Sequence, residues 1–148
     1  DNPAQALLNW TTRATSGLMV CAVEGKVSES FDVTIEEWFS NPSKGKRKRL
    51  QYLCDLLGFV SPPPGYLRYR LFHRAASAVK ECQRFRGHTP AMIVHSFSPE
   101  KAGFEDYEAF VAMLGGKAEP ELMTEVGLPN GHMLLLGWAC GDYSYLRV

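Results

Sequence analysis

The sequence predicts an α/β fold, in which a central mixed β-sheet of about four or five strands has helices on both of its faces. Residues 18–23 form a continuously apolar run and residues 91–97 form a second strand of the buried type, as in strands covered on both faces. Helical segments separate these strands. The 148 residues, 45% apolar and 22% charged, fit one globular domain and exclude a disordered, collagen-like or disulfide-dense chain.

Two strands and a short helix are expected first. Residues 7–13 indicate a weak strand, and the turn residues 14–17 separate it from a strong strand at residues 18–27. Residues 34–37 match a capping box, in which Thr and Glu three positions apart bond each other's backbone N–H groups. This box opens a short helix that ends at Phe39.

Two longer helices are expected next. Apolar residues recur at i, i+3, i+4 and i+7 from Leu50, which predicts a helix over residues 44–57 that ends at Gly58. A proline-rich connector follows at residues 61–65. Residues 66–86 carry an apolar face at helical spacing and predict the longest helix of the chain.

The last third alternates again between strand and helix. After the strand at residues 91–97, aromatic and aliphatic residues predict a helix over residues 104–114. Residues 129–131, Pro-Asn-Gly, indicate a turn before a strand at residues 132–139. A two-residue hairpin loop then returns the chain as a final strand at residues 143–148.

The charge is balanced overall and uneven along the chain. The 16 basic residues equal the 16 acidic ones, which argues against a histone-like polycation. Residues 1–90 hold 13 Lys and Arg against 8 Asp and Glu, whereas residues 91–148 hold 3 against 8. Each part therefore carries five charges of one sign in excess, and this asymmetry permits a local basic patch.

Apolar runs and cysteine spacing indicate the compartment of the protein and whether it binds zinc. The chain has no run of about 18 apolar residues and no signal-peptide pattern, so we expect a cytosolic protein without a membrane partner. Its four cysteines contain no C-x-x-C pair, and each lies in an apolar context. We therefore expect buried free thiols and no zinc site.

Glu24 and Lys26 are the residues that most directly suggest chemistry. They end an apolar strand, and residues two apart project from the same face of a strand. A carboxylate there can bind Mg²⁺ or Mn²⁺, and an ammonium can orient a water molecule or stabilise a phosphate. A plain salt bridge at a strand end is the alternative reading of the pair.

The context of this pair resembles a known superfamily. A Glu-x-Lys motif that ends a buried strand, after a hairpin and before a helix and another strand, resembles the core of the PD-(D/E)XK (restriction-endonuclease-like) superfamily. The chain is also similar to an uncharacterised bacterial family of this fold. The residues that carry the two resemblances are Ala22-Val23-Glu24-Gly25-Lys26, Leu71-Phe72-His73-Arg74-Ala75-Ala76-Ser77-Ala78, Met92-Ile93-Val94-His95-Ser96-Phe97-Ser98 and Leu136-Gly137-Trp138.

The sequence departs from the superfamily at one important position. The superfamily places an Asp on the strand before Glu-x-Lys, whereas residues 4–16 contain neither Asp nor Glu. Three explanations stay open: an inactive site, a carboxylate supplied from elsewhere such as Glu29 or Asp32, or a truncated chain. The resemblance also implies that residues 1–148 form a single domain that lacks the superfamily's first helix and strand.

Basic and histidine side chains accompany the pair. The start of the helix at residues 44–57 carries five basic residues, and the following long helix adds Arg70, His73 and Arg74. A phosphate backbone could compensate their charge, and a solvated helix start is the alternative. The five residues expected to contact nucleic acid are Lys44, Lys46, Arg47, Lys48 and Arg49.

The resemblance therefore implies a metal-dependent nuclease that hydrolyses phosphodiester bonds in DNA. Glu24 would hold Mg²⁺ or Mn²⁺, Lys26 would contact the phosphate or the attacking water, and His73 would assist proton transfer. Arg70 and Arg74 would bind the nucleic acid. The alternative is a catalytically inactive module of the same fold that binds nucleic acid or a protein partner. A second carboxylate facing Glu24 separates the two hypotheses.

Overall fold

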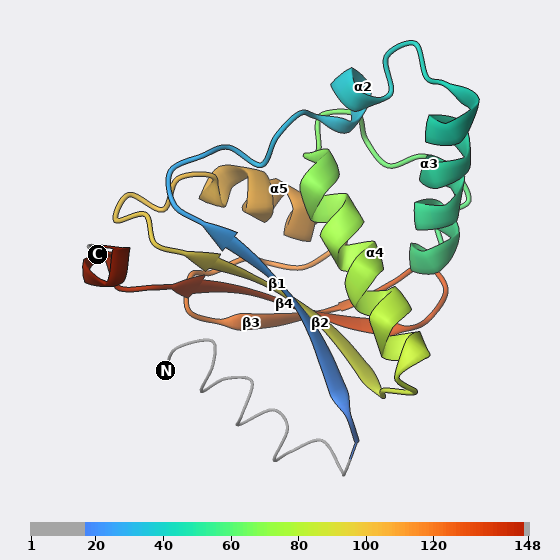
Figure 1. Cartoon of the computed structure of the whole chain (residues 1–148). Coiled ribbons are helices and arrows are strands. Elements are labelled where there is room, and N and C mark those ends of the chain that lie inside the picture. Colours follow the sequence, from blue (N-terminus) through green and yellow to red (C-terminus); the bar gives the residue numbers. More distant parts are fainter. Residues whose placement is uncertain (1–16, 147–148) are drawn as a thin grey trace.

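The computed structural model describes residues 17–146, which form an α/β domain around a four-stranded mixed sheet (Figure 1). The strands are β1 (Met19–Lys26), β2 (Thr89–Ser96), β3 (Met123–Gly127) and β4 (Met133–Cys140). The weak strand predicted at residues 7–13 lies outside the described residues.

The strand order is β1-β2-β4-β3. β1 runs parallel to β2 and β2 parallel to β4, whereas β3 and β4 are antiparallel. This arrangement confirms the predicted mixed sheet. Three helices lie on the connection from β1 to β2, so the side chains at the end of β1 face helices that follow them in sequence.

Most of the helices begin and end close to the positions that local sequence signals predict. α2 (Ile35–Trp38) starts with the predicted capping box, and α3 (Lys44–Leu57) ends at Gly58 in a left-handed conformation with φ of 80°. α4 (Tyr69–Arg84) begins three residues later than predicted, because the backbone of residues 67–69 bonds to residues 33–35. α5 (Phe104–Met113) matches its predicted segment.

The end of α3 touches a distant turn. The Asn130 amide donates to the carbonyl of Leu56 across 3.4 Å, and Asn130 belongs to the turn between β3 and β4. A Cβ atom at Gly58 would lie 2.5 Å from the backbone nitrogen of Asn130. Only glycine therefore fits this contact.

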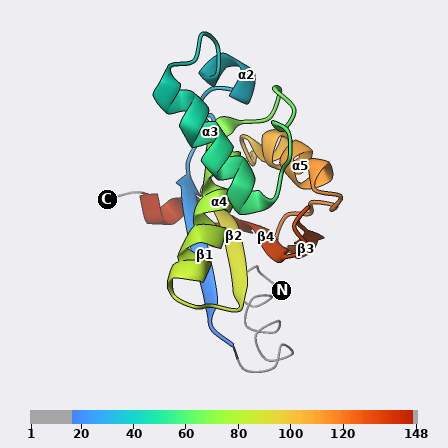
Figure 2. The same cartoon turned by 90° about the vertical axis from the view of Figure 1, so that its right-hand side faces the viewer.

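Helices α3, α4 and α5 lie on one side of the sheet (Figures 1 and 2). Ala91 and Leu135, which alternate with the core-facing residues of β2 and β4, are buried on the other face. Met92, Val94 and Trp138 point toward α4 and α5 and are buried in the main core. The apolar run in β1 suggested double coverage, but Leu18 and Val23 are each 53% exposed. Apolarity of an edge strand did not distinguish a covered face from an open one.

The strand predicted at residues 143–148 is wrong for residues 143–146, and residues 147 and 148 lie outside the described residues. Residues 143–146 form a 3₁₀ helix, and the carboxylate of the preceding Asp142 accepts from the N–H of Ser144. A returning strand would need a free edge of β4, and β2 and β3 occupy both of its edges. The predicted turn at residues 129–131 is correct, but it joins β4 to β3, a short strand that the sequence reading missed.

Candidate functional site

Glu24 and Lys26 project from β1 toward the helices, as the alternation of the strand predicted. Glu24 is only 4% exposed and Lys26 only 2%, although both are charged residue types. Gly25 lies between them, and a Cβ atom built on it meets nothing within 4 Å, so the opposite face of the strand is open here. The pair therefore sits at the inner surface of the sheet, below the first turns of α4.

Both carboxylate oxygens of Glu24 accept from arginines of α4. One oxygen lies 3.1 Å from Arg70 Nη1, and the other lies 2.6 Å from Arg74 Nε. The two arginines are four residues apart and share one side of the helix. Arg70 also reaches Asp32, with Nη2 3.8 Å from Oδ2. Glu24 thus fixes the directions of both guanidinium groups, whose outer faces are in contact with solvent.

Lys26 is held by the loop that follows β1. Its ammonium donates to the carbonyl of Ser30 and lies 3.8 Å from the carboxylate of Glu29. The same ammonium lies 4.6 Å from the centre of the Phe31 ring, within the range of a cation–π contact. Burial lowers the pKa of Lys26, and the nearby Glu29 and Glu24 carboxylates oppose that effect.

The described residues do not fit a divalent cation at Glu24. Each of its oxygens accepts a hydrogen bond from a guanidinium group, and these two positive charges beside the carboxylate repel a divalent cation. Of the two replacement carboxylates that the sequence suggested, Glu29 is paired with Lys26 and Asp32 with Arg70. Within residues 17–146, no group of three or more His, Cys, Asp or Glu side chains is placed to hold a metal.

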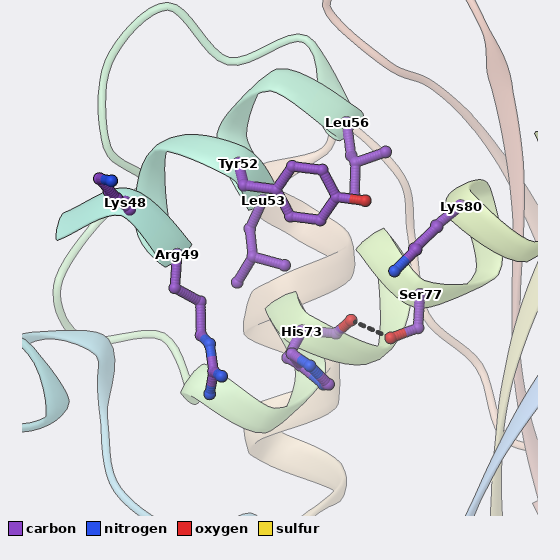
Figure 3. Close-up of a pocket in the computed structure, with 8 residues that line it drawn as sticks. All are labelled: Lys48, Arg49, Tyr52, Leu53, Leu56, His73, Ser77 and Lys80. Atoms are coloured by element: carbon purple, nitrogen blue, oxygen red, sulfur yellow. Dashed lines mark hydrogen bonds between the residues drawn. The ribbon is translucent and has the colours of Figure 1, made fainter. Parts of the chain in front are cut away.

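A groove of about 480 Å³ lies between α3 and α4, and we call it the α3–α4 groove (Figure 3). Its rim is basic and its floor is apolar. In the close-up, Tyr52 from α3 and Lys80 from α4 point toward each other across the groove, and Arg49 extends toward the side of His73. The lining residues are Lys48, Arg49, Tyr52, Leu53, Leu56, His73, Ser77 and Lys80.

A second hollow of about 280 Å³, the arginine hollow, adjoins this groove. It shares Arg49 and His73 with the α3–α4 groove, so these two side chains stand where the groove and the hollow adjoin. Its lining residues are Asp32, Arg49, Tyr69, Arg70, His73 and Arg74. The arginines that hold Glu24 therefore also face this surface.

His73 lies at the junction of the two depressions. Burial lowers its pKa, and the positive charges of Arg74, Arg49 and Arg70 lower it further, against a smaller opposite effect of Glu24. The imidazole is consequently neutral at neutral pH and offers one donor and one acceptor. Its backbone carbonyl accepts from the Ser77 hydroxyl across 2.9 Å. His95 lies elsewhere, on the opposite face of β2 and next to the Phe97 ring.

The five basic residues at the start of α3 do not form one face. Lys48 and Arg49 line the α3–α4 groove, but Lys46 donates to the carbonyl of Trp38 across 2.7 Å. Arg47 lies over the Phe39 ring and lines a different hollow. Lys44 stands in the first turn of the helix. Because an α-helix turns about 100° per residue, adjacent side chains must point in different directions.

Comparison with known proteins assigns the chain to a family. A family model described as "Domain of unknown function (DUF6946)" matches residues 3–143. The chain belongs to this family. No curated protein and no solved structure matches it. None of the helices in residues 17–146 is long and apolar enough to span a bilayer.

The sequence reading missed three lining residues of this DUF6946 domain: Tyr52, Ser77 and Lys80. A signal for two of them was present, because His73, Ser77 and Lys80 recur at helical spacing on the exposed side of α4. Tyr52 lies one turn after Arg49 on α3. That these two helical faces meet depends on the packing of α3 against α4, which neither pattern reports.

Proposed function

We propose that the DUF6946 domain binds the phosphate backbone of a nucleic acid, with DNA as the favoured partner, along the surface shared by α3 and α4, without cleaving it. The observation that carries this proposal is the set of unpaired cations in the α3–α4 groove. In the described part of the chain, no carboxylate lies within 4 Å of the charged groups of Lys48, Arg49 or Lys80.

The local charge supports an anionic ligand. The groove and the arginine hollow together hold five Lys and Arg side chains, and the carboxylates at this surface are those of Glu24 and Asp32. A surplus of about three positive charges thus lies at two adjoining hollows of a chain whose net charge is zero. Phosphate oxygens can neutralise this surplus, and the release of counterions from the polymer favours binding.

The extent of the depression supports a polymeric ligand. Arg49 lines the α3–α4 groove, the arginine hollow and a third hollow beside Trp38 and Lys46. Cations are therefore spread over three adjoining depressions instead of being gathered round one point. A chain of regularly spaced phosphates matches this distribution better than a single anion does.

The arrangement around Glu24 is the basis for proposing binding without cleavage. We assign Glu24 a positioning role, in which its carboxylate holds Arg70 and Arg74 toward the ligand. A catalytically silent member of the restriction-endonuclease-like fold would keep the Glu-x-Lys strand and the helix after it while losing the metal site. The parallel β1–β2 pair with α4 between them in sequence is compatible with that fold.

Metal-dependent DNA hydrolysis is the second candidate function. It is favoured by one observation, the burial of Glu24 and Lys26 side by side at the end of β1. The two candidates differ in whether the protein converts the nucleic acid that it binds.

Fluorescence anisotropy of labelled DNA and RNA oligonucleotides, titrated with the whole chain at several NaCl concentrations, tests the proposal. We expect affinity to fall with salt, and the combined variant Lys48→Gln, Arg49→Gln, Lys80→Gln to bind at least about ten-fold more weakly with a shallower salt slope. A control variant carries the same change of charge away from the groove, at the exposed positions 86, 101 and 117 (Arg86→Gln, Lys101→Gln, Lys117→Gln).

Equal loss in both variants, or no binding to any oligonucleotide, would overturn the proposal. The same oligonucleotides, incubated with the protein and Mg²⁺ or Mn²⁺, are expected to stay intact. Cleavage that disappears in the Glu24→Gln variant would instead establish the nuclease.

A further inference from the structure

The α3–α4 groove contains aromatic and apolar side chains, which a site for phosphate alone does not require. We propose that it takes a single-stranded nucleic acid, with one unpaired base seated against Tyr52 and the neighbouring phosphates at Arg49 and Lys80. The inference rests on the proposed function and names the form of nucleic acid that this same surface selects.

The floor of the groove is the first argument for a base. Tyr52 is 46% exposed, and Leu53 and Leu56 lie beside it within the groove (Figure 3). Phosphate groups gain nothing from an apolar or aromatic surface, whereas a base buries its flat face on one. The volume of about 480 Å³ falls within the range of pockets that enclose small organic ligands.

The position of Lys80 is the second argument. Its ammonium lies 5.6 Å from the centre of the Tyr52 ring, in a cation–π contact that places a positive charge where a base would stack. A base that stacks on the ring displaces the flexible lysine, whose ammonium then reaches the adjoining phosphate. The groove thus combines the stacking surface of the Tyr52 ring with the Lys80 ammonium, which can move from the ring to a phosphate.

Polar groups at the edge of the groove complete the site. The Ser77 hydroxyl donates to the carbonyl of His73, which leaves its oxygen lone pairs available to accept from a base. The neutral His73 imidazole adds a donor and an acceptor at the junction with the arginine hollow. One base can therefore lie in the α3–α4 groove while the strand continues over Arg70 and Arg74.

A duplex does not satisfy this geometry. Bases within a double helix are stacked on each other and paired, so their faces are closed to a protein side chain. A strand with an unpaired base meets the aromatic floor and the basic rim at once. A free mononucleotide would meet the floor but would leave the cations of the arginine hollow without phosphates.

The test compares binding of the whole chain to a short oligothymidylate, to a duplex of the same length and to adenosine monophosphate as competitor. We expect the single strand to bind at least about ten-fold more tightly than the duplex, and the mononucleotide to compete poorly. The Tyr52→Leu variant is expected to lose at least about five-fold in affinity for the single strand and none for the duplex, whereas Tyr52→Phe keeps the affinity of the parent.

Two further measurements keep the result specific. Photo-crosslinking of a strand that contains 5-iodouracil, followed by peptide mass spectrometry, is expected to mark Tyr52. The control is Tyr66→Leu, which removes a tyrosine that is 64% exposed outside the groove and should leave binding unchanged. Circular dichroism melting curves of the variants confirm that each is folded.

The outcomes separate the two proposals. A duplex bound as tightly as the single strand, an unaltered affinity in Tyr52→Leu, or equal competition by the mononucleotide overturns the inference and leaves the backbone-binding function standing. Absence of binding to every nucleic acid overturns both.

Discussion

Replacing Glu24 with glutamine removes the charge of a buried carboxylate and leaves the shape of the side chain almost unchanged. The two arginines of α4 then lose their ionic partner, while β1 keeps its pairing with β2. Because the carboxylate joins the edge strand to the helix above it, the substitution tests whether the ion pairs stabilise this junction.

The size of the effect follows from the burial of the groups. A hydrogen bond to a charged group contributes about 1.5–3 kcal/mol to the free energy of unfolding, and Glu24 accepts one from each arginine. The side chains of Arg70 and Arg74 are 45% and 39% exposed, so water replaces part of what they lose. We expect a loss of about 2–3 kcal/mol, which corresponds to a fall of roughly 4–12 °C in Tm.

Urea unfolding and thermal melting, both followed by circular dichroism, measure this loss. The matched control is Glu108→Gln, which removes an exposed carboxylate on α5 and should change the free energy of unfolding by less than about 0.5 kcal/mol. If Glu24→Gln behaves like the control, the arginine pairs do not stabilise the fold. If the Glu24→Gln variant is more stable than the parent, the Glu24 carboxylate destabilises the fold. That result would be expected if the carboxylate is placed to bind a ligand instead of the two arginines.

Three other changes have expected outcomes. Lys26→Met should alter the free energy of unfolding in urea by less than about 1 kcal/mol or raise it, because burial disfavours the ammonium and Glu29, the carboxylate left behind, is exposed; a loss above about 3 kcal/mol would contradict this. The pKa of His73 is lower in the folded protein than in the unfolded chain, so the unfolded chain takes up the proton first and stability falls as the pH drops below about 6.5. His73→Asn should therefore show a smaller decrease of Tm between neutral and mildly acidic pH than the parent, and equal decreases would refute the assignment. Gly58→Ala should lower the free energy of unfolding by at least about 1 kcal/mol, since the residue needs a positive φ and its Cβ meets Asn130; an unchanged urea midpoint would show that the contact relaxes freely.

Elements with local signals were predictable from the sequence. The capping box of α2, the apolar spacing of α3 and its end at Gly58 all involve residues within a few positions of one another. The errors concern long-range choices. Whether residues 143–146 pair with β4 depended on β3, a short segment with little apolar alternation that occupies that edge.

The candidate site also has a part that local sequence predicts and a part that depends on long-range packing. The alternation of a strand was enough to place Glu24 and Lys26 on one face, and the structure confirms it. Their partners could not be predicted, because Arg70 and Arg74 lie 46 and 50 residues away from Glu24 along the chain. The superfamily resemblance suggested a metal for the carboxylate, whereas the packing of α4 on β1 supplies two guanidinium groups.

The contact between the end of α3 and the β3–β4 turn has a consequence for biosynthesis. Asn130 is 74 residues beyond Leu56, so the turn that supports α3 leaves the ribosome long after the helix itself. During synthesis α3 can form its own hydrogen bonds early, but it gains this support only when the last hairpin has emerged. A nascent chain that stops before the hairpin would thus carry α3 and α4 without the contact between Leu56 and Asn130 that supports the end of α3.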